Sequence, residues 1–243
     1  MSETNEDILH SDPERVEGFP CLVAVLSLSP SQRGEIDHVT SRRKQKSHIE
    51  VVFSGRDIPR SNVTRSRLRV LAIEGTAWAA SAAVFETTDP TQRTDDERVD
   101  IFTDAYAPDS GGIHPREAAE HMHEAIPEVV AQARGTAEEW AAEHDEQTQN
   151  PVDAVAFSRG PGLGPCLRIV ATAARATAQR FDVPLVGVNH MVAHLEIGRH
   201  RSGFESPVCL NASGANAHLL GFRNGRYRVL GETMDTGVGN AID

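Results

Sequence analysis

The chain has 243 residues, 39% of them hydrophobic, and a formal net charge of −11. This length and composition allow a sizeable core in one or two domains. No apolar run approaches the ~18 residues of a membrane-spanning helix, and the opening residues MSETNEDILHSDPE lack the basic and then apolar pattern of a secretory signal. These features predict a cytoplasmic protein with no membrane partner.

The cysteines and the charge distribution exclude further classes of protein. Cys21, Cys166 and Cys209 are odd in number and widely spaced, which argues against a disulfide framework and a cysteine zinc site. Residues 1–68 hold ten acidic and ten basic side chains, so all the excess negative charge lies beyond them, where no lysine occurs. We interpret this as an acidic, halophile-like surface adapted to high salt. No basic patch in the sequence indicates a nucleic-acid partner.

The N-terminal part differs from the rest in its patterning. Residues 1–68 show no sustained periodicity, which predicts a poorly structured extension. From Arg69 the pattern sharpens: RVLAIEGTAWAASAAVFETT predicts a buried strand, a turn at Gly75 and Thr76, and a second strand. DERVDIFTDAY predicts a third strand.

Helix and strand signals then alternate. The segment from His114 to His144 is rich in helix formers and predicts two helices, or one kinked helix, with interruptions at Pro127 and Gly135. PVDAVAFS predicts a buried strand, ATAARATAQRF a helix, and VPLVGV another strand. This alternation predicts an α/β layer architecture.

Three short strands are predicted beyond His200, in SPVCLNAS, AHLLGFR and RYRVLGE. Asn224 and Gly225 fall between the last two, and an Asn-Gly pair in that place is typical of a tight hairpin turn.

Two histidines in VNHMVAHLEIGRH form the first candidate site. If the segment is helical, His190 and His194 share one face with β-carbons about 5–6 Å apart, which suits two imidazoles on one metal ion. Coincidence is the alternative, because the chain has 11 histidines, and such a pair can also be satisfied by backbone partners. Met191 stands where the HExxH pattern of zinc proteases has its glutamate, so protease chemistry lacks its base.

Glycine-rich loops form the second kind of candidate site. In SRGPGLGPCLRIVATAARA a loop joins a strand to a helix starting near Cys166, and amides at a helix start can hold an anion. The loop lacks the Gly-Lys-Ser/Thr ending of a P-loop, and a purely structural connection is the more ordinary interpretation. In NASGANAH, the small residues Ser213 and Gly214 let backbone amides approach a phosphate. The turn at residues 74–76 is either a plain turn or a nucleotide-facing tip.

Four segments in this order carry a family resemblance: SRGPGLGPCLRIVATAARATA, GVNHMVAHLEIG, SGANAHLLGF and GETMDTGVGNAID. They resemble motifs of the tRNA N6-adenosine threonylcarbamoyltransferase family, whose archaeal and eukaryotic members are the catalytic subunit of the KEOPS complex and whose bacterial members are called TsaD or Gcp. The resemblance implies an actin-like, Hsp70-like ATPase fold of two α/β lobes. It divides the chain into the extension at 1–68, a first lobe at 69–205 and the start of a second at 206–243.

The resemblance also implies an activity. The family transfers a threonylcarbamoyl group from threonylcarbamoyl-adenylate to N6 of adenosine 37 in tRNAs that read codons beginning with A. It implies one divalent metal ion, iron or zinc, and an adenylate substrate or ATP as cofactors. The implied partners are tRNA and KEOPS subunits, including the kinase subunit.

The implied metal ligands are His190 and His194, and no further catalytic residue is assigned. The implied substrate or nucleotide contacts are Asn211, Ala212, Ser213, Gly214, Ala215, Asp243 and Thr76. Asn211 stands where archaeal relatives commonly carry a tyrosine near the metal, and the chain reaches Asp243 without the family's further metal-binding aspartate. The alternative expectations are therefore a truncated fragment that only binds nucleotide or a partner, and a metallopeptidase.

Overall fold

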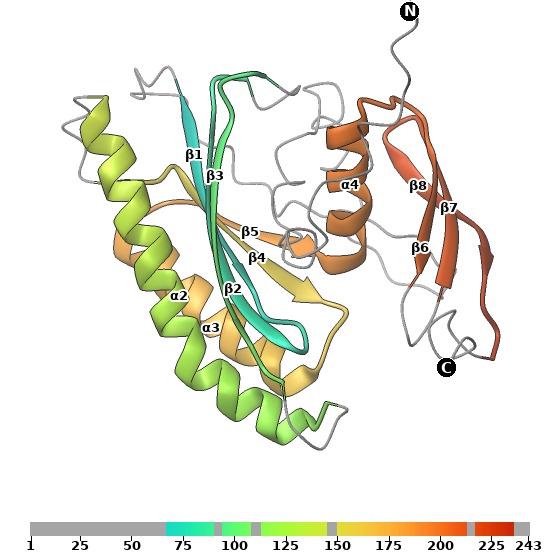
Figure 1. Cartoon of the computed structure of the whole chain (residues 1–243), viewed down its shortest axis with the longest axis horizontal. Helices are drawn as coiled ribbons and strands as arrows, with labels where there is room; N and C mark the ends of the chain where they lie inside the picture. Colours follow the sequence, from blue (N-terminus) through green and yellow to red (C-terminus); the bar gives the residue numbers. More distant parts are fainter. Residues whose placement is uncertain (1–66, 90–93, 108–112, 145–149, 213–216, 236–243) are drawn as a thin grey trace, which may run out of the picture.

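The computed structural model describes residues 67–89, 94–107, 113–144, 150–212 and 217–235. All but the last two residues of the predicted extension at 1–68 lie outside these ranges. Within them, the elements alternate as the sequence predicts, with strands first, then helices and strands in turn, then three closing strands (Figure 1). None of the helices in these ranges is both long and apolar enough to cross a membrane.

Five strands form the main sheet in the order β3-β2-β1-β4-β5 (Figure 1). They are β1 (Leu68–Glu74), β2 (Ala79–Thr87), β3 (Arg98–Ala105), β4 (Ala154–Gly160) and β5 (Leu185–Asn189). β2 pairs antiparallel with β1 and β3, whereas β4 pairs parallel with both β1 and β5. The carboxyl ends of β1, β4 and β5 therefore meet at one edge, where ligands bind in open α/β sheets.

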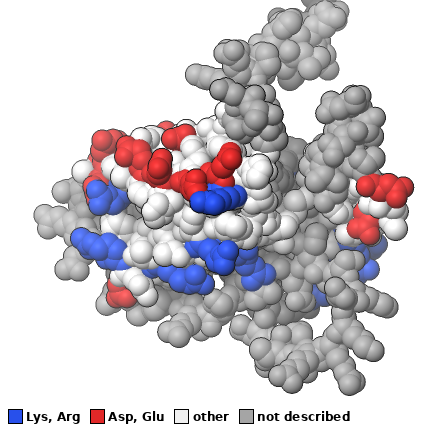
Figure 2. Space-filling view, turned by 90° about the horizontal axis from the view of Figure 1, so that it is seen from below, with Lys and Arg blue, Asp and Glu red and all other residues white. Residues whose placement is uncertain are grey.

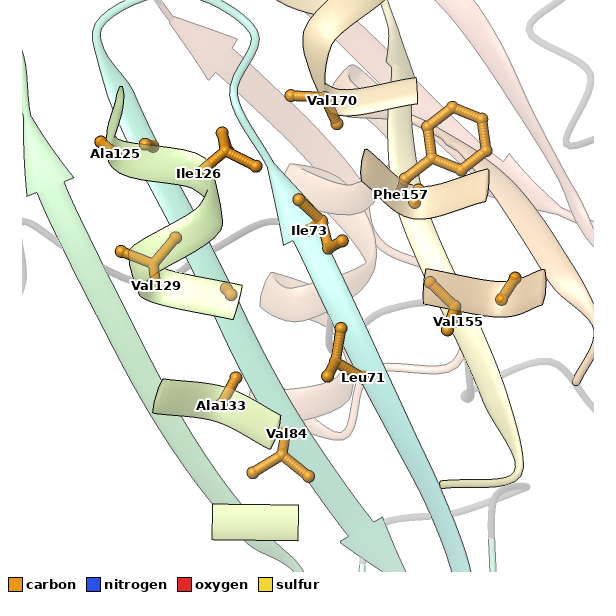
Figure 3. Packing of buried hydrophobic residues seen from close by; sticks show 14 of the residues in the cluster. Leu71, Ile73, Val84, Ala125, Ile126, Val129, Ala133, Val155, Phe157 and Val170 are labelled. Atoms are coloured by element: carbon orange, nitrogen blue, oxygen red, sulfur yellow. The ribbon is translucent and has the colours of Figure 1, made fainter. Parts of the chain in front are cut away.

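Helices cover both faces of this sheet. Leu71 and Ile73 of β1 are fully buried in a cluster with α2 (Pro115–Glu143) and α3 (Gly164–Phe181) (Figure 3). Val70 and Ala72 point to the opposite face, in a cluster with Ala193 of α4 (His190–Ser202). A strand buried on both faces reads as a continuous apolar run, which is why LRVLAI predicted this strand well. Full burial of a Leu or Ile side chain contributes about 1.5–3 kcal/mol.

The segment from His114 to His144 was predicted to form either two helices or one kinked helix. It forms a single helix, α2. The prediction of two helices is wrong, because the helix continues through Pro127 and Gly135. Proline removes the hydrogen bond to the carbonyl four residues earlier, here that of His123. Pro127 and His123 are both exposed, so water can satisfy this carbonyl, and the apolar face of α2 stays packed on the sheet.

A buried ion pair links β1 to β2 at the end of the sheet opposite the carboxyl end of β1. Arg69 and Glu86 are 1% and 0% exposed, and Arg69 Nε donates to Glu86 Oε2 over 2.8 Å. A second guanidinium nitrogen donates to the carbonyl of Pro151 over 2.9 Å. Because the charges are satisfied from several sides, the pair can stay in the interior.

The last three strands form a separate antiparallel sheet in the order β6-β7-β8. They are β6 (Val208–Ala212), β7 (Ala217–Arg223) and β8 (Arg226–Glu232). Asn224 and Gly225 both have positive φ, 52° and 74°, as a type I′ hairpin turn requires, so that prediction is confirmed. Leu220 and Phe222 pack with Leu195 of α4, which thus lies between the two sheets (Figure 1).

Candidate metal and nucleotide site

The histidine pair opens α4 at the carboxyl end of β5. Asn189, the last residue of β5, accepts hydrogen bonds from the amides of Met191 (3.0 Å) and Val192 (3.2 Å). This side chain is an N-cap, and it fixes the helix start at His190. The segment is therefore helical, and His190 and His194 share one helical face, as their spacing predicted.

The two rings converge at their outer nitrogens. His190 Nε2 and His194 Nε2 are 3.3 Å apart, with ring centroids 4.6 Å apart and planes at 79°. Two nitrogens bound at about 2.0–2.1 Å to one tetrahedral ion lie roughly 3.4 Å from each other. The pair therefore fits two positions on a single ion, and imidazole suits both iron and zinc.

The described residues do not complete a metal site on their own. Across these ranges, no group of three or more His, Cys, Asp and Glu side chains is placed to hold an ion. Cys166 and Cys209 are free thiols and are buried and partly buried, respectively. The histidine pair is thus a partial donor set, and coordination number governs how tightly such a set binds.

Metal binding requires neutral imidazoles. Burial lowers the pKa of His194, the nearby His190 lowers it further, and the charge of Glu74 opposes both. The pKa of His194 is therefore below its ordinary value of 6.5, and its lone pair is available at neutral pH.

Glu74 lies behind the pair, at the end of β1, and is 7% exposed. Its Oε1 accepts from the amide of Thr76 over 2.8 Å, and its Oε2 accepts a short hydrogen bond from the hydroxyl of Ser158 in β4. Oε2 is also 3.5 Å from Nδ1 of His190. Burial raises the pKa of Glu74. The opposing effects of His190, Ser158 and Thr76 are together larger, so the pKa lies below its ordinary value. The carboxylate is therefore ionised at neutral pH.

Sequence reasoning placed Glu74 only in the turn at residues 74–76, with no contact to the histidines, and gave no role to Ser158. A carboxylate that closes an otherwise apolar strand, directly before a glycine, was the available signal for Glu74. Ser158 carried no comparable signal, because a serine near a strand end is ordinary. The fold brings both to the histidines through the parallel pairing of β1, β4 and β5.

The turn after β1 packs against the glycine-rich loop after β4. The amide of Leu163 donates to the carbonyl of Thr76 over 2.7 Å. A β-carbon on Gly162 would lie 2.7 Å from that same carbonyl oxygen, so only glycine permits this approach. The loop therefore has a structural task. Thr76 is buried, its amide and carbonyl are both bonded within the protein, and its contact with a nucleotide remains a prediction.

The second predicted loop is described only at its start. Asn211 and Ala212 lie on β6, whereas Ser213, Gly214, Ala215 and Asp243 fall outside the described residues. Asn211 pairs across the sheet with His218. Its Nδ2 and the Nδ1 of His218 are buried, and neither has a hydrogen-bond partner within the described ranges. Buried polar atoms without partners are costly. Nucleotide binding by Asn211, Ala212, Ser213, Gly214, Ala215 and Asp243 stays a prediction.

Comparison with known proteins gives the family. The model of the family described as "TsaD: tRNA N6-adenosine threonylcarbamoyltransferase" matches residues 98–243. A "probable bifunctional tRNA threonylcarbamoyladenosine biosynthesis protein" of Haloarcula marismortui is 78% identical over 183 residues, which are 72% of this chain and 32% of that protein. A "tRNA N6-adenosine threonylcarbamoyltransferase" of Methanocella arvoryzae is 49% identical over 175 residues, 72% of this chain and 48% of that protein.

The chain thus spans about a third to a half of the length of these relatives. Among solved structures, YeaZ from Pseudomonas aeruginosa gives a TM-score of 0.40 at 18% identity, over 68% of this chain and 66% of that one. The sheet order and the covering helices establish the α/β class that the sequence predicted. The α/β layers agree with the fold that the resemblance implied, and the chain belongs to the tRNA N6-adenosine threonylcarbamoyltransferase family.

Proposed function

We propose that this chain supplies the metal-binding part of an enzyme that transfers threonylcarbamoyl from its adenylate to N6 of adenosine 37 in tRNA. The observation that carries the proposal is the 3.3 Å approach of His190 Nε2 and His194 Nε2, at the edge of the sheet where the parallel strands end. Membership of the family supports the reaction class. Because the chain spans only part of its relatives, the whole reaction is proposed for the longer protein that contains such a segment.

The ion proposed for this pair is iron or zinc. When bound, it supplies positive charge that polarises oxygens of the threonylcarbamoyl donor. The chain's own residues have separate tasks. His190 and His194 would hold the ion through their Nε2 nitrogens, and Asn189 caps the helix start that carries them.

We assign the adenylate to the loop that follows β6. Amides at Ala212, Ser213, Gly214 and Ala215 would hold its phosphate, as small side chains permit, with Asn211, Thr76 and Asp243 as further contacts. The adenosine amine is a poor nucleophile. The rate must therefore come from the positioned and polarised donor.

The proposed tRNA partner has a matching surface. Arg168, Arg175 and Arg180 of α3 are exposed, and this helix carries no acidic residue. Seen from below, the described acidic and basic side chains gather in largely separate bands (Figure 2). Phosphates are attracted to arginine and repelled by carboxylates, so the tRNA backbone would approach over α3. Arg168 and Arg175 lie seven residues apart and thus on one side of α3, and they form a local basic pair within a chain of net negative charge.

The kinase and other KEOPS subunits are further proposed partners, and the cytoplasm is the proposed location. The resemblance to a family whose archaeal and eukaryotic members are the KEOPS catalytic subunit supports the first, and the tRNA substrate in the family's description supports the second.

A chimera tests the proposed activity. Residues 69–243 would replace the matching part of the Haloarcula relative, which is 78% identical, and N6-threonylcarbamoyladenosine in tRNA would be measured by mass spectrometry. We expect modification by the chimera and none after His190→Ala or His194→Ala. His123→Ala changes an exposed histidine on α2 and should leave modification intact. Undiminished modification by either site variant would refute the proposal.

A further inference from the structure

The Nδ1 nitrogen of His190 faces away from His194, toward Glu74. A neutral imidazole has one N–H and one lone pair. If Nε2 of His190 faces a cation, Nδ1 must carry the hydrogen and needs an acceptor. This Nδ1 is buried and makes no hydrogen bond with the described residues, and Glu74 Oε2 lies 3.5 Å from it, at the outer limit of a hydrogen bond.

This inference rests on the proposed metal role. We infer that Glu74 is a positioning residue, whose carboxylate accepts a hydrogen bond from Nδ1–H of His190 and so directs the Nε2 lone pair toward the ion. An ionised carboxylate can only accept hydrogen bonds, so it selects the Nδ1–H tautomer. Nε2 of His190 is then an acceptor, and it faces Nε2 of His194.

Glu74 is itself held in place from two sides. The Thr76 amide binds Oε1 from the turn after β1, and the Ser158 hydroxyl binds Oε2 from β4. The carboxylate therefore has no freedom to turn away from His190. Three strand ends are joined in this way, since Glu74 closes β1, Ser158 lies near the end of β4, and His190 follows β5.

The first experiment measures zinc affinity of the metal-free chain by competition with a chromophoric chelator. Partners that orient metal-binding histidines are typically worth about 10–100-fold in affinity, and we expect that loss in Glu74→Gln. Ser158→Ala, which only frees the carboxylate, should show a smaller loss in the same direction. The matched control is Glu196→Gln, because Glu196 is 3% exposed and lies on α4 but is bonded to Arg199. Its affinity should equal that of the wild type.

The second readout requires no metal. Nitrogen-15 shifts of the His190 ring, assigned by their absence in His190→Ala, report which nitrogen carries the hydrogen. We expect Nδ1–H in the wild type and in Glu196→Gln, and a shift toward Nε2–H in Glu74→Gln. An Nε2–H tautomer in the wild type would overturn the inference, as would a Glu74→Gln variant that binds zinc like the wild type.

The two proposals fail separately. A wild-type chain that binds no zinc contradicts the metal role, while the tautomer still decides the position of Glu74. A wild-type chain that binds zinc through both histidines, with Glu74→Gln unchanged, contradicts only the role of Glu74. If Glu74→Gln does not fold, Ser158→Ala provides the same comparison, and zinc affinity equal to the wild type in that variant would count against the inference.

Discussion

Gly162 lies directly against Thr76, so that a β-carbon on this glycine would come within 2.7 Å of the Thr76 carbonyl oxygen and 2.8 Å of its Cβ. The obstructing atoms belong mainly to backbone, which cannot move aside as a flexible side chain can. The turn after β1 and the loop after β4 are therefore held at a separation that only glycine allows.

The first prediction is that Gly162→Ala destabilises the protein. Overpacking of this kind costs about 1–3 kcal/mol, and thermal denaturation followed by circular dichroism measures it. Gly164→Ala is the matched control, because a β-carbon there meets nothing within 4 Å and alanine is the better helix former. Gly164→Ala should be neutral or slightly stabilising. Equal melting temperatures for Gly162→Ala and the wild type would show that the contact is not tight.

The second prediction concerns the interior ion pair. Arg69→Met leaves the carboxylate of Glu86 buried without its main partner, and breaking a buried pair typically costs about 3–5 kcal/mol. Urea unfolding of the variant should show that loss. Arg134→Met removes an exposed i,i+4 partner of Glu138 and should change the free energy of unfolding by less than about 0.5 kcal/mol. A similar effect in both variants would contradict the assigned burial.

The third prediction is a pH dependence of the metal-free protein. The pKa of His194 is lowered in the folded state by burial and by His190, with Glu74 opposing. As the pH falls below about 6.5, the unfolded chain takes up this proton before the folded chain does. Stability is therefore full above that pH and declines below it. His194→Gln should flatten the decline, as measured by urea unfolding at several pH values. Parallel profiles would argue against this assignment.

The fourth prediction tests the basic pair of Arg168 and Arg175 on α3. Arg168→Glu combined with Arg175→Glu should weaken tRNA binding by the chimera and reduce its dependence on salt, because fewer counterions are released. Filter binding over a range of salt concentrations measures both. The control is Arg116→Glu together with Arg134→Glu, which reverses charge on α2. If the α2 variant loses as much affinity as the α3 variant, tRNA does not approach over α3.

Much of this fold could be predicted because local patterns and global packing agree. The apolar run of β1 ends at Ile73, just before Glu74 and Gly75, and the Asn224-Gly225 pair fixes a hairpin. Pro127 misled prediction because an exposed proline can be accommodated in a long helix whose other face is packed. Helical spacing also predicted that His190 and His194 share a face.

The contacts of Glu74 could not be predicted in the same way. Glu74, Ser158 and His190 are far apart in the sequence, and only the parallel register of three strands brings them together. The roles of Ser213, Gly214, Ala215 and Asp243 still rest on resemblance, since these residues lie outside the described ranges.

Metal content tests the central claim most directly. The chain would be held in equilibrium dialysis against excess zinc, and bound zinc would be measured by inductively coupled plasma mass spectrometry beside His190→Ala, His194→Ala and His123→Ala. We predict about one ion per chain for the wild type and His123→Ala, and background for the other two variants. Equal metal content in all four proteins, or none in any, would contradict a shared ion between His190 and His194.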